Sequence, residues 1–366
     1  MRHTFSERSV RWLQLRSASP AHEQRLLADG GPVPVGVKLG STRTAIAYPT
    51  GEGLRVIRTL TCLAAYEEPL TGKTQYRFGD DAAAEYPDRV EFVLRSGLPE
   101  EEDRLNRVTR FFEAVVDSHD VPSNSVVVYA TPAVEDTAGF RNLRAVIERS
   151  PIGSHAIEGY PEALCGSIPA LGAGLEAVEE TFLTLNLAAT SLELMAYRQG
   201  EQLSPTRSGA VTANEIDRDI ITNVENETQG RVHLDINSAR EYKEQHADFE
   251  NFEPFTDVIQ QPGGGSHEFT IEWSVMDAVD AYLDRVVDIF VTEFLPQFRR
   301  SHRRVARDAL DRPVILTGGM ACVPGIVTEF ERRTSEELEA DIEATAPDRA
   351  DIAATVGAQR IAARLV

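Results

Sequence analysis

Lysine is almost absent from this sequence of 366 residues, whose formal net charge is −21. Lys38, Lys73 and Lys243 are the three lysines among 37 lysines and arginines, so 34 of these basic residues are arginines. The strong negative charge excludes a nucleic-acid groove that covers a whole face, and we predict no nucleic-acid partner. An acidic surface that takes its positive charge from arginine suits a cytoplasm of high salt.

Paired cysteines and long apolar runs are absent as well. Cys62, Cys165 and Cys322 lie far apart without a CxxC pair, which argues against a zinc site or a disulfide framework and for a reducing compartment. No run of about 18 apolar residues occurs, so no membrane span is expected. The length allows two domains with well-buried cores, and we expect a cytoplasmic protein.

Two short apolar runs flank a polar turn in Val35–Tyr48, which reads VGVKLGSTRTAIAY. This alternation predicts a strand, a turn at Gly40–Thr44 and a second strand. A glycine and three hydroxyl residues leave backbone N–H groups unobstructed, as a phosphate-binding turn requires. The turn is not a Walker loop, because G-x-x-x-x-G-K-[ST] is missing. Taken alone, the stretch fits an ordinary edge hairpin equally well.

The same plan returns in the second half of the chain, at Leu183–Tyr197 (LTLNLAATSLELMAY). An apolar strand, a turn of small residues and another apolar strand follow one another there. When the two stretches are superposed, Leu39 aligns with Leu187 and Thr42 with Thr190. The repetition indicates two hairpins of one kind, one in each half of the chain.

A third motif lies at Val314–Ile326 (VILTGGMACVPGI), where a predicted strand runs into a Gly-Gly turn and then Pro324-Gly325. The two hairpins and this turn together resemble the nucleotide-binding motifs of the actin superfamily, which includes actin, bacterial MreB, FtsA, the DnaK-type chaperones and the sugar kinases. Within that superfamily the opening VGVKLGSTRT and the acidic, lysine-poor composition are similar to those of haloarchaeal actin homologues of the salactin and volactin type.

The resemblance implies an α/β fold of two RNase-H-like (actin-like ATPase) domains that flank a nucleotide cleft. Gly159–Ala173 and Ala353–Ala358 resemble the two helices that connect such domains. The expected organisation is a disordered or accessory tail at 1–32, domain I at 33–175 with a small subdomain at about 60–100, domain II at 176–340, and a C-terminal helix at 341–366 that returns to domain I.

The resemblance also implies ATP as the ligand, which the family binds with Mg²⁺; we predict no metal-ligating residue in this chain. Lys243 matches the lysine of a helix that flanks the ribose. The implied nucleotide-binding residues are Lys38, Gly40, Ser41, Thr42, Arg43, Ala188, Ala189, Thr190, Lys243, Gly318, Gly319 and Met320.

Three positions that carry the family's chemistry are altered. Lys38 and Asn186 replace the aspartates of the two hairpins, and Tyr160 replaces the residue that orients the attacking water. Because a divalent cation prefers carboxylate oxygens, an ammonium at Lys38 would repel it and attract the phosphates directly. The candidate catalytic residues are Glu162, Asp217 and Asn186, and whether ATP is hydrolysed stays open.

Two segments have competing interpretations. The first 31 residues are read as a disordered tail or an over-extended start rather than a membrane-binding amphipathic helix, because Pro20 and Gly30-Gly31-Pro32 interrupt the apolar pattern.

The run Arg299–Arg307 follows a long amphipathic helix predicted at Trp273–Phe298. Basic residues that complement the C-terminus of that helix are favoured over a contact patch for an acidic partner protomer or polyanion.

The glycine-rich Gln261–Ser266 (QPGGGS) also resembles a phosphate loop at first sight. It lies between two alternating runs, Val258–Gln260 and His267–Ile271. This position predicts the turn of a β-hairpin rather than a phosphate loop.

The resemblance implies a nucleotide-binding cytoskeletal protein that polymerises into cytoplasmic filaments for cell shape, organisation or inheritance. Self-association is therefore the expected partnership. An actin-fold scaffold that does not hydrolyse ATP, and a small-molecule kinase of the same superfamily, are the alternatives. The kinase would need an aspartate base, and no obvious candidate follows the second hairpin.

Overall fold

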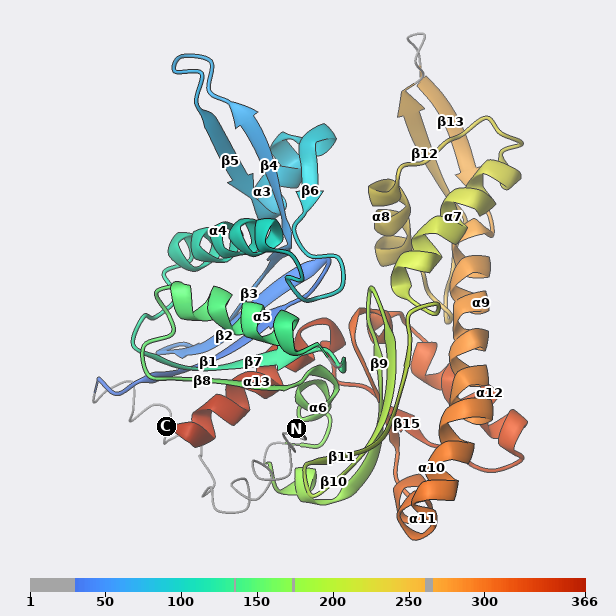
Figure 1. The fold of residues 1–366 in the computed structure, drawn as a ribbon. Coiled ribbons are helices and arrows are strands. Elements are labelled where there is room, and N and C mark those ends of the chain that lie inside the picture. The colour runs from blue at the N-terminus through green and yellow to red at the C-terminus, as the bar shows by residue number, and fades with distance from the viewer. Residues whose placement is uncertain (1–29, 135, 173–174, 261–265) are drawn as a thin grey trace. The chain divides into compact units, whose positions relative to one another are not determined.

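The computed structural model describes residues 30–134, 136–172, 175–260 and 266–366. The chain divides into two compact units, and each is described by itself (Figure 1). Unit 1 comprises the described residues up to 180 together with 197–202 and 352–366, and unit 2 comprises 181–196 and 203–351.

A five-stranded sheet in the order β3-β2-β1-β7-β8 forms the centre of unit 1. Its strands are β1 (Val33–Leu39), β2 (Arg43–Thr50), β3 (Gly53–Leu60), β7 (Ser125–Thr131) and β8 (Ala156–Pro161). The first three strands pair antiparallel, whereas β7 is parallel to both β1 and β8. All of β7 is buried, so its unbroken apolar run is what a sheet covered on both faces requires.

Helices lie on both faces of this sheet (Figure 1). They are α4 (Glu102–Ser118), α5 (Thr137–Arg149), α6 (Glu162–Ser167) and α13 (Ala350–Leu365). Phe111 and Leu143, from α4 and α5, are buried in one core with strand residues. On the other face α13 crosses β1 so closely that a Cβ on Gly36 would lie 2.2 Å from the carbonyl oxygen of Thr355. Glycine is therefore required at this crossing.

The first connecting helix differs from the sequence-based prediction. The expected helix at Gly159–Ala173 begins only at Glu162, because β8 continues its parallel pairing with β7 as far as Pro161. The helix also ends at Ser167, so the prediction is wrong for its first three residues and for those after Ser167. The close crossing expected of its small residues is present, since a Cβ on Gly357 of α13 would lie 1.8 Å from the carbonyl oxygen of Cys165.

A smaller three-stranded sheet in the order β5-β4-β6 also belongs to unit 1. Its elements are β4 (Cys62–Glu67), β5 (Thr74–Phe78), α3 (Gly79–Glu85), the 3₁₀ turn η1 (Pro87–Arg89) and β6 (Val90–Phe92). Gly79 begins α3 with a φ of 63°, a conformation that favours glycine.

A second five-stranded sheet, in the order β11-β10-β9-β14-β15, repeats the plan of the first. Its strands are β9 (Thr181–Leu187), β10 (Leu192–Arg198), β11 (Glu201–Ser208), β14 (Val314–Thr317) and β15 (Ala344–Thr345), preceded by the 3₁₀ turn η2 (Glu176–Glu179). Again the strand next to the hairpin, β14, runs parallel to its first strand, β9.

The helices of unit 2 pack on one large apolar core. They are α7 (Ala213–Glu227), α8 (Ile236–His246), α9 (Ser274–Asp288), the π-helical η3 (Ile289–Phe294), α10 (Leu295–Ser301), α11 (Arg303–Leu310), the 3₁₀ turn η4 (Gly319–Cys322) and α12 (Ile326–Leu338). Within the described ranges, no helix is sufficiently long and apolar to cross a bilayer.

Two sequence-based predictions for unit 2 are confirmed. The long helix expected at Trp273–Phe298 is present as α9, η3 and α10 in succession, with a π-helical segment just before Pro296, a residue that cannot donate a helical hydrogen bond. The hairpin expected around Gln261–Ser266 is present as the antiparallel pair β12 (Phe255–Gln260) and β13 (Ser266–Ile271). Its turn, 261–265, lies outside the described residues.

Candidate functional site

The two hairpin turns have the same backbone hydrogen bond. In the first turn the N–H of Gly40 donates to the carbonyl oxygen of Arg43 at 3.1 Å. In the second turn the N–H of Ala188 donates to the carbonyl oxygen of Ser191 at 3.0 Å. The alignment of the two stretches made from the sequence is therefore confirmed at the level of the backbone.

Lys38 lies beside the first turn, one residue before the end of β1. Its Cε would be 3.5 Å from a Cβ built on Gly40, so the lysine stem lies over the turn. Its Nζ is 2.7 Å from Oε1 of Glu162, the first residue of α6. The two side chains are 16% and 12% exposed, so this ion pair is mostly buried but keeps some contact with solvent. Ser41, Thr42 and Arg43 of the turn are partly buried.

Tyr160 lies on β8, one residue before the end of that strand. Its carbonyl oxygen accepts a hydrogen bond of 3.1 Å from Oγ1 of Thr131, at the end of β7. Through β7 and β8 the sheet thus brings Tyr160 and Glu162 to the same strand end. Two of the altered family positions, Lys38 and Tyr160, are therefore held by strands of one sheet.

Asn186 lies beside the second turn, in the position that matches Lys38. It is 1% exposed, and its Nδ2 donates to Oε2 of Glu193 at 3.3 Å. Glu193 is fully buried; its Oε1 accepts from Oγ of Ser191 at 3.4 Å and lies 3.8 Å from Nε of Arg207. Sequence reasoning missed Glu193, although a carboxylate inside the apolar run LELMAY was a usable signal.

Two other elements of unit 2 join the second turn. The N-terminus of α7 donates to it, from Ala213 N–H to Ala188 O at 3.2 Å and from Asn214 N–H to Ala189 O at 3.0 Å. The turn after β14 packs against the end of β9, because a Cβ on Gly318 would lie 2.6 Å from the carbonyl oxygen of Leu187. Thr190, at the tip of the turn, is partly buried.

The two glycines that follow β14 differ sharply. Gly318 has a φ of 90° and no room for a side chain. Gly319 would place a Cβ in open space, with no atom within 4 Å. A flat ligand could therefore approach the backbone at Gly319. Met320 is 3% exposed and belongs to the core of unit 2, so its side chain is not available to a ligand.

Lys243 connects α8 to the start of α7. Its Nζ donates to the carbonyl oxygen of Ala213 at 2.8 Å and forms a buried ion pair with Asp217. Burial lowers the pKa of Lys243, and the negative charge of Asp217 opposes that change. Nε of Arg240 is 3.3 Å from the other carboxylate oxygen of Asp217. Asp217, a candidate catalytic residue, is thus fully buried between two cationic side chains.

Each unit, taken by itself, offers a group that suits a nucleotide. In unit 2 the backbone at Gly319 faces open space, and in unit 1 Lys38 supplies a positive charge. Among the described residues no group of three or more His, Cys, Asp or Glu side chains is arranged to hold a metal ion. Lys38 also places an ammonium where a metal-binding carboxylate would be needed.

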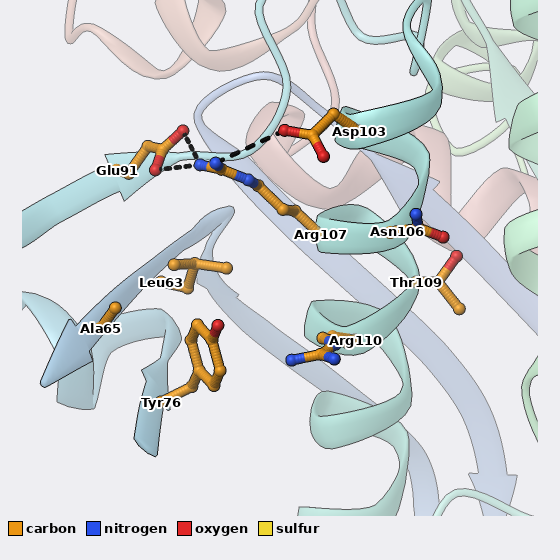
Figure 2. Close-up of a pocket in the computed structure, with 9 residues that line it drawn as sticks. All are labelled: Leu63, Ala65, Tyr76, Glu91, Asp103, Asn106, Arg107, Thr109 and Arg110. Carbon is orange, nitrogen blue, oxygen red and sulfur yellow. Dashed lines mark hydrogen bonds and ion pairs between the residues drawn. The ribbon is translucent and has the colours of Figure 1, made fainter. Parts of the chain in front are cut away.

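A separate hollow of about 480 Å³ lies in unit 1, between the three-stranded sheet and α4 (Figure 2). Arg107 forms ion pairs there with Glu91 and, at 3.6 Å, with Asp103. The guanidinium of Arg110 lies 5.4 Å from the ring centroid of Tyr76. None of the site residues named from the sequence lines this hollow.

Solved structures with this arrangement define the class of protein. MreB5 of Spiroplasma citri bound to AMPPNP matches with a TM-score of 0.72 at 14% identity, over 90% of this chain and 95% of that chain. A MamK double helical filament matches with a TM-score of 0.69 at 16% identity, over 92% and 98%. The predicted two-domain actin-like α/β fold is therefore confirmed.

The family follows from sequence comparison. The family model named Salactin matches residues 32–366. Salactin of Halobacterium salinarum is 52% identical over 335 residues, which cover 92% of each chain. This chain therefore belongs to the Salactin family, and the predicted relation to haloarchaeal actin homologues is confirmed.

Proposed function

We propose that this protein binds an adenine nucleotide and polymerises into cytoplasmic filaments that organise or shape the cell or its inheritance. The observation that carries the proposal is the repeated sheet, in which equivalent hairpins have the same turn hydrogen bond. Similar structures are described as MreB5 bound to AMPPNP, MreB5 bound to ADP and a MamK double helical filament. These relatives support both parts of the proposal.

The nucleotide is proposed to contact both turns, with its base near Gly318, Gly319 and Lys243. Gly319 lacks a Cβ, so its backbone can approach a flat base closely. The phosphates would be met at the first turn by Gly40, Ser41, Thr42, Arg43 and Lys38, and at the second turn by Ala188, Ala189 and Thr190. Lys38 supplies positive charge that reaches solvent, which favours a direct contact with phosphate.

The proposed function has two forms, which differ in whether ATP is hydrolysed. One is an active ATPase, and the other is a scaffold that binds ATP without cleaving it. Glu162 is a candidate base beside Lys38, and its carboxylate is engaged by that lysine. Asp217 is enclosed by Lys243 and Arg240. These two ion pairs favour the scaffold, and they also weigh against a small-molecule kinase, which needs a carboxylate free to accept a proton.

Electron microscopy of the purified protein in molar KCl, with and without ATP and magnesium, tests the proposal. We expect filaments that depend on ATP. A parallel measurement of phosphate release distinguishes the active ATPase from the scaffold. Protein that stays monomeric under every condition, although it is folded and binds ATP, would refute polymerisation, and protein without ATP affinity would refute the nucleotide site.

A further inference from the structure

The hollow between the three-stranded sheet and α4 contains none of the residues assigned to the nucleotide (Figure 2). Its volume of 480 Å³ lies within the range of about 300–1,000 Å³ that is usual for small-molecule sites. All of its lining residues belong to unit 1. The hollow can therefore be interpreted from this unit alone.

One wall of the hollow is the face of the three-stranded sheet that turns toward α4. Leu63 and Ala65 lie two residues apart on β4 and share this face, and Tyr76 of β5 lies directly opposite Ala65. Ala64 points the other way and is buried with Ala82 of α3. Ala65 is exposed, because its single methyl group leaves the space toward α4 unfilled. The sheet therefore gives the hollow a largely apolar wall.

The other wall is a polar stripe of α4. Four lining residues follow the three- and four-residue spacing of one helix face: Asp103, Asn106, Arg107 and Arg110. A different side of the helix is buried in the core, through Phe112 among others. An apolar wall opposite a polar one suits an occupant with an apolar body and a polar end.

Two arginines of this stripe reach from α4 toward the sheet (Figure 2). Arg107 forms ion pairs with Glu91 of β6 and Asp103 of α4, so two carboxylates match its charge. The guanidinium of Arg110 lies 5.4 Å from the ring centroid of Tyr76. The two arginines thus line the same hollow with different partners, one anionic and one aromatic.

Arg110 has hydrogen-bonding capacity to spare. Its contact with Tyr76 is that of a cation over a ring, and no oxygen of the described chain accepts a hydrogen bond from its N–H groups. The side-chain amide of Asn106, one turn earlier on α4, likewise has no hydrogen-bond partner among the described residues. A guanidinium and an amide are therefore both available to a ligand at the polar wall.

The opposite face of the same sheet holds a similar arginine together with its anion. The guanidinium of Arg77, on β5, lies 5.9 Å from the ring centroid of Tyr66, and its Nε donates to Oε2 of Glu85 on α3 at 2.8 Å. Arg110 repeats the ring contact of Arg77 without such a carboxylate. The comparison indicates that a carboxylate from outside the chain would complete the contact at Arg110.

We propose that this hollow binds a small organic anion, a carboxylate attached to a flat apolar body. The carboxylate takes at Arg110 the place that Glu85 takes at Arg77, through two parallel hydrogen bonds from the guanidinium, and Asn106 supplies a further donor. The apolar body lies against Ala65 and its neighbours on the sheet. The site is separate from the proposed nucleotide site and gives unit 1 a ligand of its own.

Three probes separate the contribution of charge from that of apolar area. They are 2-naphthoate, its neutral isostere 2-naphthamide, and acetate, each measured by equilibrium dialysis in molar KCl with ATP present to occupy the nucleotide site. Naphthoate should bind, and naphthamide should bind about tenfold more weakly because it loses the charge-assisted hydrogen bonds. Acetate has no apolar body and should not displace naphthoate. Failure of the nucleotide site would leave this test intact, because its readout is probe binding.

Two variants locate the bound probe. Arg110→Met should lower the naphthoate affinity about tenfold, to that of naphthamide. Ala65→Trp fills the hollow and should abolish binding of both naphthyl probes, with Ala65→Leu as the milder change if the tryptophan lowers stability. The matched control is Arg104→Met, which removes the same charge from α4 at a residue outside the hollow and should leave naphthoate binding unchanged.

Three results would overturn the proposal. The first is a lack of saturable binding at about 1 mM naphthoate. The second is equal affinity of the wild-type chain for naphthoate and naphthamide. The third is wild-type naphthoate affinity in Arg110→Met and in the Ala65 variants, although these unfold cooperatively.

Discussion

The first and second hairpins share one backbone plan but hold charge in different ways. At the first, Lys38 and Glu162 form a partly exposed ion pair at 2.7 Å. At the second, Asn186 and Glu193 are buried together, and Nε of Arg207 is 3.8 Å from the carboxylate. The repetition therefore extends to the backbone and stops at the side chains.

The two turns also differ in the contacts that hold them. The second turn accepts hydrogen bonds from the N-terminus of α7, and the Gly318 turn packs against the strand end before it. The first turn lies beside the Lys38–Glu162 ion pair, which keeps some contact with solvent. We interpret the second turn as the more rigid of the two.

The largest expected effect comes from the glycines beside the second turn. Gly318→Leu should lower the free energy of unfolding by roughly 3 kcal/mol or more, because the side chain meets the Leu187 carbonyl at a positive φ. Gly319→Leu should change it by less than about 1 kcal/mol and abolish ATP binding instead. Guanidinium unfolding and ATP titration of both variants measure this. Equal stabilities, or unaltered ATP affinity in Gly319→Leu, would contradict the placement.

Removing the lysine should cost unequal amounts of unfolding free energy at the two ion pairs, Lys243–Asp217 and Lys38–Glu162. Lys243→Met leaves Asp217 buried with only Arg240 beside it and should cost about 3 kcal/mol of stability. Lys38→Met breaks a pair that keeps some contact with solvent, so it should cost less than Lys243→Met. The same unfolding measurements decide between them. A larger loss at Lys38 would show that the Lys38–Glu162 pair stabilises the fold more than the Lys243–Asp217 pair does.

A third prediction concerns magnesium. If Lys38 contacts phosphate, ATP affinity should depend little on magnesium, and Lys38→Asp should weaken binding in EDTA by more than about tenfold and introduce a steep magnesium dependence. The matched control is Lys73→Asp, at an exposed lysine between β4 and β5. Titrations with magnesium and with EDTA, in molar KCl, test it. The same magnesium dependence in all three proteins would make Lys38 a surface residue with no ligand.

The smallest expected effect is an acid sensitivity of unit 2. The ring of His246 stacks on Phe255 with centroids 3.5 Å apart, and burial lowers the pKa of His246, which Asp257 opposes. Because the unfolded chain then binds the proton more readily, the free energy of unfolding should fall as pH drops from the usual histidine value through the lowered one. His246→Phe keeps the stack and should remove this part of the pH dependence. An unchanged pH profile in that variant would assign the sensitivity to other groups.

Much of the fold follows from local signals. The alternation in Val35–Tyr48 and Leu183–Tyr197 predicts both hairpins and their alignment, because a strand's face pattern has a period of two residues. The unbroken apolar run of β7 predicts a central strand for a similar reason. The acidic, arginine-based surface is likewise a property of composition.

Tertiary structure alone decided which side chains meet. Lys38 was expected to face a ligand, and the fold brings Glu162 to it. Lys243 matched a family position, but its buried partner Asp217 comes from another helix, and Glu193 gave only a weak signal inside an apolar strand. A periodic pattern tells which face of an element a residue occupies. It cannot tell which distant element will cover that face, because that depends on how whole sheets and helices pack.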